Sequence, residues 1–182
     1  SGDATLHWSE QGQARCALWR SEGGQPLPRR VVCADDTMPA DTAYRLACEG
    51  TALLWRGDFQ NARQLLLALG RRLDKKSQRK SPAKSPAASG FPHAFHLYRQ
   101  SQAQRARLLA SLLIELDVQW HCALRRAPNW SLACSEAWGA VPAEAHAQSV
   151  LVPLRDLLGV VGAHEWRKKG VEIPALDGAR IH

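Results

Sequence analysis

The amino-acid sequence predicts an α+β fold, a small antiparallel β-meander packed on four or five helices and ending in a β-hairpin. Short β-prone runs bounded by turn residues fill the first 34 residues, and apolar residues recur at helical spacing over most of the chain after them. A further β-prone run with a turn signal comes after residue 170. Together these observations favour strands at both ends of the chain and helices between them.

The meander is expected from three runs, residues 4–8, 14–20 and 30–34. A Glu-Gln-Gly-Gln turn separates the first two, and a Gly-Gly-Gln-Pro break precedes the third. Asp35, Asp36 and Thr37, together with Pro39, then mark the passage into a helix.

Two amphipathic helices are expected around a compact polar stretch. Apolar residues at helical spacing predict one helix at about 41–55 and a second over 62–73. Between them lie Arg56, Gly57, Asp58 and Asn61. Gly57 can end the first helix, and Asp58 can cap the second by accepting a hydrogen bond from a first-turn amide. A ligand-binding role for Asp58 is the alternative.

Residues 75–90 are rich in serine, proline and lysine and contain no large apolar residue, so they are expected to form a flexible linker or an exposed loop. A solvated tether explains this composition, and contact with nucleic-acid phosphates is the alternative. The cations that would make that contact are Lys75, Lys76, Arg79, Lys80 and Lys84.

After this segment, periodicity predicts a long helix over 95–116, a strand over 118–125 and a short helix over 131–138. A last helix is expected over 153–168, ended by Gly170, and a hairpin over 171–182. Residues 1–74 and 91–182 are expected to form one domain, joined by the 75–90 segment.

The composition is that of an ordinary globular chain. Its 182 residues are 45% hydrophobic and 23% charged, which suffices for one sizeable core. No run approaches eighteen apolar residues and the start is polar, so a cytoplasmic protein without a membrane partner is expected. The five cysteines include no C-x-x-C pair and are expected to be free thiols.

The sequence contains no glycine-rich nucleotide loop, no H-E-x-x-H motif and no nucleophile elbow, and no catalytic residue is predicted. His93 and His96 can share a helix face, but no nearby third ligand completes a metal site, and no metal is expected.

Several polar, charged and aromatic residues lie near the end of the last predicted helix. His164 can accept a proton near neutral pH, Glu165 can orient it, and Trp166 offers a flat face for stacking. The alternative is a helix end at which Arg167 and its neighbours complement the macrodipole while Trp166 covers the edge of the core. Arg99 and Arg105 belong either to a solvated face or to the lining of an anionic-substrate site.

Three stretches carry a resemblance to a known family: LLWRGDFQNARQLL at 53–66, FHLYRQSQAQRARLLASLLIELD at 95–117, and LRDLLGVVGAHEWRKKGVEIPAL at 154–176, followed by ARIH. They resemble the N-terminal region of a bacterial family of class I methyltransferases that depend on S-adenosylmethionine. In that family these segments precede a Rossmann-like catalytic domain, whose glycine-rich donor loop and acceptor-side motif have no counterpart here.

The resemblance implies an accessory domain that positions a substrate or docks onto a following catalytic domain of the same polypeptide. This chain would hold no cofactor, S-adenosylmethionine would serve the full-length protein, and the acceptor would be RNA, a protein or a small molecule. The residues expected to form the substrate or docking surface are Arg56, Asp58, Asn61, Arg99, Arg105, His164, Glu165, Trp166 and Arg167. The rival interpretations are a stand-alone nucleic-acid-binding module that uses the lysine-rich segment and a purely structural interaction domain.

Overall fold

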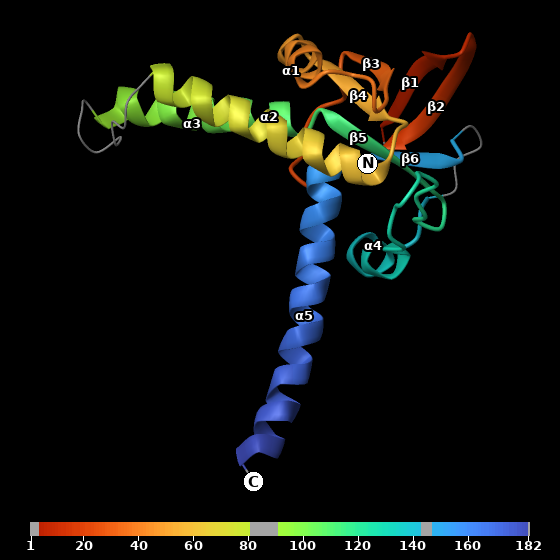
Figure 1. Ribbon diagram of the computed structural model, residues 1–182, viewed down its shortest axis with the longest axis vertical. Helices are drawn as coiled ribbons and strands as arrows, with labels where there is room; N and C mark the ends of the chain where they lie inside the picture. Colours follow the sequence, from red (N-terminus) through yellow and green to blue (C-terminus); the bar gives the residue numbers. More distant parts are fainter. Residues whose placement is uncertain (1–3, 81–90, 143–146, 182) are drawn as a thin grey trace.

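A computed structural model describes residues 4–80, 91–142 and 147–181 (Figure 1). The described part of the chain contains six strands and five helices, in the order β1 (Thr5–Glu10), β2 (Gln13–Trp19), β3 (Arg30–Ala34), α1 (Ala40–Cys48), β4 (Thr51–Trp55), α2 (Phe59–Lys80), α3 (Phe91–Leu109), β5 (Leu112–Asp117), α4 (Ser131–Trp138), β6 (Ser149–Pro153) and α5 (Leu154–Ile181). The α+β class and the expected number of helices are confirmed.

The six strands form one mixed sheet in the order β1-β2-β6-β5-β4-β3. The pairs β1–β2 and β5–β6 are antiparallel, whereas β2–β6, β3–β4 and β4–β5 are parallel. The expected antiparallel meander of the first three strands is therefore wrong. Of these three strands, only β1 and β2 form a hairpin, whereas β3 lies at the far edge of the sheet. The helix α1 then returns the chain to the start of β4, so that β3 and β4 are parallel.

The predicted helix over 41–55 is in fact a helix followed by a strand. The helix α1 stops at Cys48, Gly50 has a positive φ of 86°, and the next five residues form β4. All five side chains of β4 are buried, so their apolar pattern does not alternate. A short run of consecutive apolar residues fits a strand that is buried on both faces as well as it fits a buried helix. Periodicity alone therefore cannot distinguish the two, and here it leads to the wrong assignment.

The same ambiguity affects the predicted helix over 95–116. Here α3 ends at Leu109, and β5 occupies residues 112–117, again a run that is apolar apart from Glu115 and Asp117. The strand expected at 118–125 is not formed. Instead, the Asp117 side chain accepts hydrogen bonds from the backbone N–H groups of Gln119 and His121 and turns the chain.

The last helix starts next to the expected position, but it does not stop at Gly170. The helix α5 continues to Ile181, so the hairpin expected over 171–182 is absent from the described residues, which end at 181. An internal glycine costs a helix only about 1 kcal/mol, so it permits an end without forcing one. Similarly, α2 continues through Lys80 into the expected linker, whose residues 81–90 lie outside the described part.

The two faces of the sheet are buried in different ways. On one face, residues of all five helices and of the strands form one core, which includes Leu46, Phe59, Leu109, Cys134 and Leu157 from the helices. The other face curls on itself, because β1 contacts β3 across an almost closed barrel. Its core comes from strands alone: Leu6, Trp8, Ala17, Val31, Ala52, Leu54, Leu113 and Leu151.

Figure 1 shows α2 and α3 side by side and extending from the sheet, while α5 leaves in a different direction. None of the helices in the described ranges combines the length and apolar content needed to cross a membrane. The five cysteines, all of which fall within those ranges, form no disulfide.

Candidate functional site

A group of charged and polar side chains covers one end of the curled face of the sheet. Side chains alternate along a strand, so the residues two positions beyond buried Trp8, Leu54 and Leu113 lie on the same face as those core residues. These residues are Glu10, Arg56 and Glu115. Arg15 and Ser149 reach the same place from β2 and β6. We call these five residues, Glu10, Arg15, Arg56, Glu115 and Ser149, the charged cap.

Arg56 lies at the centre of the charged cap. Its Nε and Nη2 donate to the two carboxylate oxygens of Glu10 at 2.9 and 2.8 Å, and its Nη1 donates to Glu115 Oε1 at 2.6 Å. The paired interaction with Glu10 is bidentate, the strongest arrangement open to a guanidinium and a carboxylate. One side chain that follows β4 therefore ties together β1 and β5.

The remaining groups complete this network. Ser149 donates its hydroxyl to Glu115 Oε2 at 2.6 Å, and Trp8 Nε1 donates to Glu10 Oε1 at 3.1 Å. Arg15 is more exposed and lies 3.5 Å from Glu115 and 3.7 Å from Glu10. Both carboxylates are thus bound to several donors, and two cations balance two anions.

The ionisation of the charged cap follows from these bonds. The hydrogen bond from Arg56 lowers the pKa of Glu10 to about 2, against the opposing effect of burial. Burial lowers the pKa of Arg56, but its hydrogen bonds with Glu10 and Glu115 outweigh this and raise the pKa above its usual value. Both groups therefore remain charged at neutral pH.

A cavity of about 570 Å³ lies beside the charged cap. Arg15, Arg56 and Glu115 line it together with Asp117, His121 and Cys122. His121 Nδ1 is 3.9 Å from Asp117, an arrangement that could orient an imidazole next to a thiol. Burial raises the pKa of Cys122, however, so its thiolate is scarce at neutral pH. The cavity offers hydrogen-bond donors and acceptors rather than an activated nucleophile.

The start of α2 contains Asp58 and Asn61, two of the predicted site residues. Asp58 Oδ1 accepts a hydrogen bond from Gln60 N at 2.9 Å, which is the capping role expected for it. Its other oxygen accepts from Arg126 Nε at 2.6 Å, and this bond lowers the pKa of Asp58 despite the opposing effect of burial. Asp36 Oδ1 accepts from Asp58 N and from Asn61 Nδ2, at 3.0 and 2.9 Å.

These contacts occupy the amino end of α2 completely. Phe59 N donates to the carbonyl oxygen of Arg125 at 2.9 Å, and the amides of Asn61 and Ala62 donate to the carbonyl oxygen of Asp58. No first-turn amide is left for an anionic ligand. The Arg-Gly-Asp stretch is thus a structural joint between β4 and α2.

The remaining predicted site residues of α2 and α3 lie away from the amino end of α2. The Arg99 guanidinium is 5.7 Å from the Phe95 ring, and Arg105 Nη1 forms an ion pair with Asp74 of α2 at 2.7 Å. Lys75 and Lys76 are exposed on α2. Arg79 and Lys80 belong to α2 as well, but their side chains and Lys84 lie outside the described part.

The residues predicted on α5 form a third location. His164 Nδ1 is 2.7 Å from Glu136 of α4, so its acidic partner is Glu136 rather than the neighbouring Glu165. Glu165 and Arg167 are exposed, and Trp166 is 76% exposed. The expected alternative in which Trp166 covers the core edge is therefore wrong.

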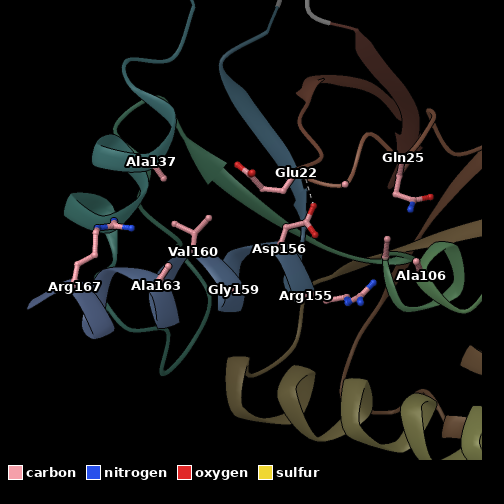
Figure 2. A pocket seen from close by; sticks show the side chains of 12 residues that line it. Glu22, Gln25, Ala106, Ala137, Arg155, Asp156, Gly159, Val160, Ala163 and Arg167 are labelled. Carbon is pink, nitrogen blue, oxygen red and sulfur yellow. Dashed lines mark hydrogen bonds between the residues drawn. The ribbon is translucent and has the colours of Figure 1, made fainter. Parts of the chain in front are cut away.

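Arg167 reaches another cavity, of about 690 Å³, between α5, α4 and the loop after β2. Figure 2 shows Arg167 and Ala137 at one end of this cavity, Asp156 beside Glu22 in the middle, and Gln25 and Ala106 at the other end. The backbone N–H of Glu22 donates to Asp156 Oδ2 at 2.9 Å, and burial raises the pKa of Asp156. The nine predicted site residues thus occupy three places: the β4–α2 joint with the charged cap, the α2–α3 pair and α5.

Four members of the charged cap are not expected from the sequence: Glu10, Arg15, Glu115 and Ser149. A signal exists for one of them, because Glu115 is the only charge within the apolar run Leu112–Leu116. A carboxylate among buried apolar residues requires a partner. Its partners Arg56, Ser149 and Arg15 lie 59, 34 and 100 residues away in the chain, which no local pattern reveals.

Within the described ranges, no three His, Cys, Asp or Glu side chains are grouped so that they could hold a metal ion. Comparison of the chain with protein-family models, with curated proteins and with solved structures finds no match.

Proposed function

We propose that this chain is an accessory domain of an S-adenosylmethionine-dependent methyltransferase, which positions a methyl acceptor or docks onto a catalytic domain that follows it in the same polypeptide. The observation that carries the proposal is the resemblance of residues 154–176 to the N-terminal region of that methyltransferase family. These residues fall on α5, which extends from the sheet (Figure 1). The Trp166 side chain on this helix is exposed. An exposed indole on a projecting helix suits a contact with another domain or a ring-bearing substrate.

An accessory role is supported by the sheet, which offers no familiar donor site among the residues that the structure describes. Doubly wound sheets bind nucleotide-like ligands where the strand order reverses, next to a free helix N-terminus. In the described sheet, the parallel strands β3, β4 and β5 follow one another in sequential order. The helix α2 follows β4, the central strand of these three. The side chains of Asp36 and Asp58 occupy the amino end of α2. We therefore propose that the donor binds to a domain that follows this one.

The first test is the reading frame downstream of His182 together with donor binding by calorimetry. We expect a glycine-rich donor loop in the downstream sequence, S-adenosylmethionine binding by the longer polypeptide, and none by residues 1–182 alone. Tight binding of the donor by the isolated chain, or a downstream sequence without such a loop, contradicts the proposal.

The second test separates positioning from donor binding in the longer protein. Trp166→Ala is expected to raise the KM for the methyl acceptor or to weaken docking, while leaving the affinity for S-adenosylmethionine unchanged. Leu132→Ala is the matched control, because Leu132 is also a large exposed apolar residue, 62% exposed, but lies on α4. If the two variants have the same KM for the methyl acceptor, α5 is not part of the proposed surface.

A further inference from the structure

The helices α2 and α3 form a paired projection that we call the basic arm. Figure 1 shows them side by side and extending from the sheet. The ion pair between Arg105 and Asp74 joins them, and residues of both helices line a shared cavity of about 530 Å³. From Pro92 to Gln104, every side chain of α3 except Ala94 is exposed, so this part of the arm lies open to solvent.

The basic arm holds more than the whole net charge of the protein. The two helices contain ten arginine and lysine residues against one acidic residue, Asp74, and so carry a net charge of +9. The complete chain has a net charge of +7, which leaves −2 for everything else. Such a separation of charge attracts a polyanion to one side of the molecule.

The cations are placed where they repel one another. Arg71 and Lys75, and Arg72 and Lys76, are four residues apart, so both like-charged pairs are neighbours on the surface of α2. Within the described residues, Arg72 and Arg105 are the only members of the arm with a carboxylate partner, Asp41 and Asp74 respectively. Each like-charged pair destabilises the helix slightly, and a bound polyanion relieves this repulsion.

Aromatic side chains lie among these cations. Tyr98 is 50% exposed and Phe95 is 41% exposed, and the Arg99 guanidinium lies 5.7 Å from the Phe95 ring. Flat rings and guanidinium planes between phosphate-binding cations are the pattern of surfaces that stack unpaired bases. Leu97 projects about 200° around the helix from Phe95, so the exposed apolar residues do not form the single stripe that a membrane surface requires.

We propose that the basic arm binds single-stranded nucleic acid. Arg71, Lys75 and Arg99 contact the phosphates, and Tyr98 stacks on a base. This role is independent of whether a catalytic domain follows the chain, since it uses side chains of α2 and α3 rather than those of α5 and involves no methyl transfer.

The test is fluorescence anisotropy of the 182-residue protein with labelled oligo(U) and oligo(dT) of about 20 nucleotides, a length that covers a typical single-strand site. Both are expected to bind with an affinity that falls steeply as salt rises. A preference for one of the two identifies RNA or DNA as the physiological strand. A base-paired duplex of the same length, polyglutamate and phosphatidylserine vesicles are expected to bind more weakly than the single strands.

A triple variant, Arg71→Gln with Lys75→Gln and Arg99→Gln, is expected to weaken binding at least about tenfold and to reduce the slope of log K against log salt by about 2. The matched control is Arg29→Gln with Arg30→Gln and Arg45→Gln, which removes the same charge from exposed positions outside the arm. The control is expected to bind nearly as the unmodified protein does. Far-UV circular dichroism checks that both variants keep their helices.

Tyr98→Ala is expected to weaken binding of the single strands about tenfold without changing the salt slope, because stacking does not release counterions. The proposal is overturned if the arm variant and its control lose affinity equally, since net charge alone then accounts for binding. It is also overturned if Tyr98→Ala has no effect, or if duplex, polyglutamate or vesicles bind as tightly as the single strands.

Discussion

Arg56 shows how one side chain can hold the ends of several strands together. Its guanidinium is directed at Glu10 on β1 and Glu115 on β5, and the side chain is 26% exposed. A cation in such a place stabilises the fold mainly because its two carboxylate partners would otherwise lose their main cationic partner beside an apolar core. Arg56 therefore connects β1 and β5 through its hydrogen bonds and also lines the adjoining cavity.

Arg56→Met is expected to lower the free energy of unfolding by about 3 kcal/mol, because it leaves two partly buried carboxylates without their main partner. Urea denaturation at pH 7 measures this change. Arg45→Met is the control, since Arg45 forms an exposed pair with Glu49 on α1 and should cost less than about 0.5 kcal/mol. Similar losses in both variants would show that the charged cap is no more important than a surface ion pair.

Glu10 gives the protein a defined sensitivity to acid. Its pKa is about 2 in the folded protein and 4.5 as the ordinary value, so folding favours the ionised carboxylate. The stability that it contributes is complete above pH 4.5 and is lost as the pH falls toward 2. Unfolding free energies measured between about pH 6 and about pH 2.5 should therefore fall less steeply in Glu10→Gln than in the unmodified protein. Parallel curves for the two proteins contradict this assignment.

At the scale of single elements, α2 depends on a tightly built joint at its start. Asp58 caps the helix, while Asp36 accepts hydrogen bonds from Asp58 N and from the Asn61 side chain. Gly57 lies directly against Asp36, and a Cβ at Gly57 would be 2.8 Å from both Asp36 N and Asp36 Cγ. The absence of a side chain at Gly57 is what allows this close approach.

Two glycine substitutions in this region should act in opposite directions. Gly57→Ala is expected to destabilise the protein by about 2 kcal/mol, because the backbone of Asp36 must move away from the new methyl group. Gly70 lies in the interior of α2, and no atom lies within 4 Å of a Cβ added there. Gly70→Ala should therefore stabilise the protein by about 0.5–1 kcal/mol. Thermal unfolding of both variants tests the pair. Stabilisation by Gly57→Ala would show that the joint is loose.

At the scale of the whole molecule, two apolar cores share the same strands. Leu113 of β5 belongs to the core enclosed by the curled sheet, and its neighbour Ile114 belongs to the core under the helices. Both side chains are fully buried. Because one strand contributes to both cores, loss of packing on one face removes support from the other.

Leu113→Ala and Ile114→Ala should each cost about 3 kcal/mol and leave a single cooperative unfolding transition. Val118→Ala, at a half-exposed position just after β5, serves as the control and should change stability little. The measurement is chemical denaturation followed by both tryptophan fluorescence and circular dichroism. Separate transitions in Leu113→Ala would show that the curled face unfolds independently of the helical layer.

Much of the element content is accessible from the sequence. The first three strands, the helix Ser131–Trp138 and the start of α5 follow from β-prone runs, turn residues and helical spacing. The cap at Asp58 is also predictable, since it depends only on the residues that immediately follow it. The pattern of β4 and β5 wrongly predicts helix, because both strands are buried on two faces and so lose the alternation that marks a strand.

The sequence by itself determined the α+β class, the local caps and turns, and the high content of basic residues, because each of these depends on neighbouring residues or on composition. Only the tertiary structure decided that the sheet is mixed and curled, that Arg56 joins Glu10 and Glu115, and that the cations of α2 and α3 project together. These features arise from pairs separated by tens of residues, and it is the burial of both sheet faces that brings such pairs together.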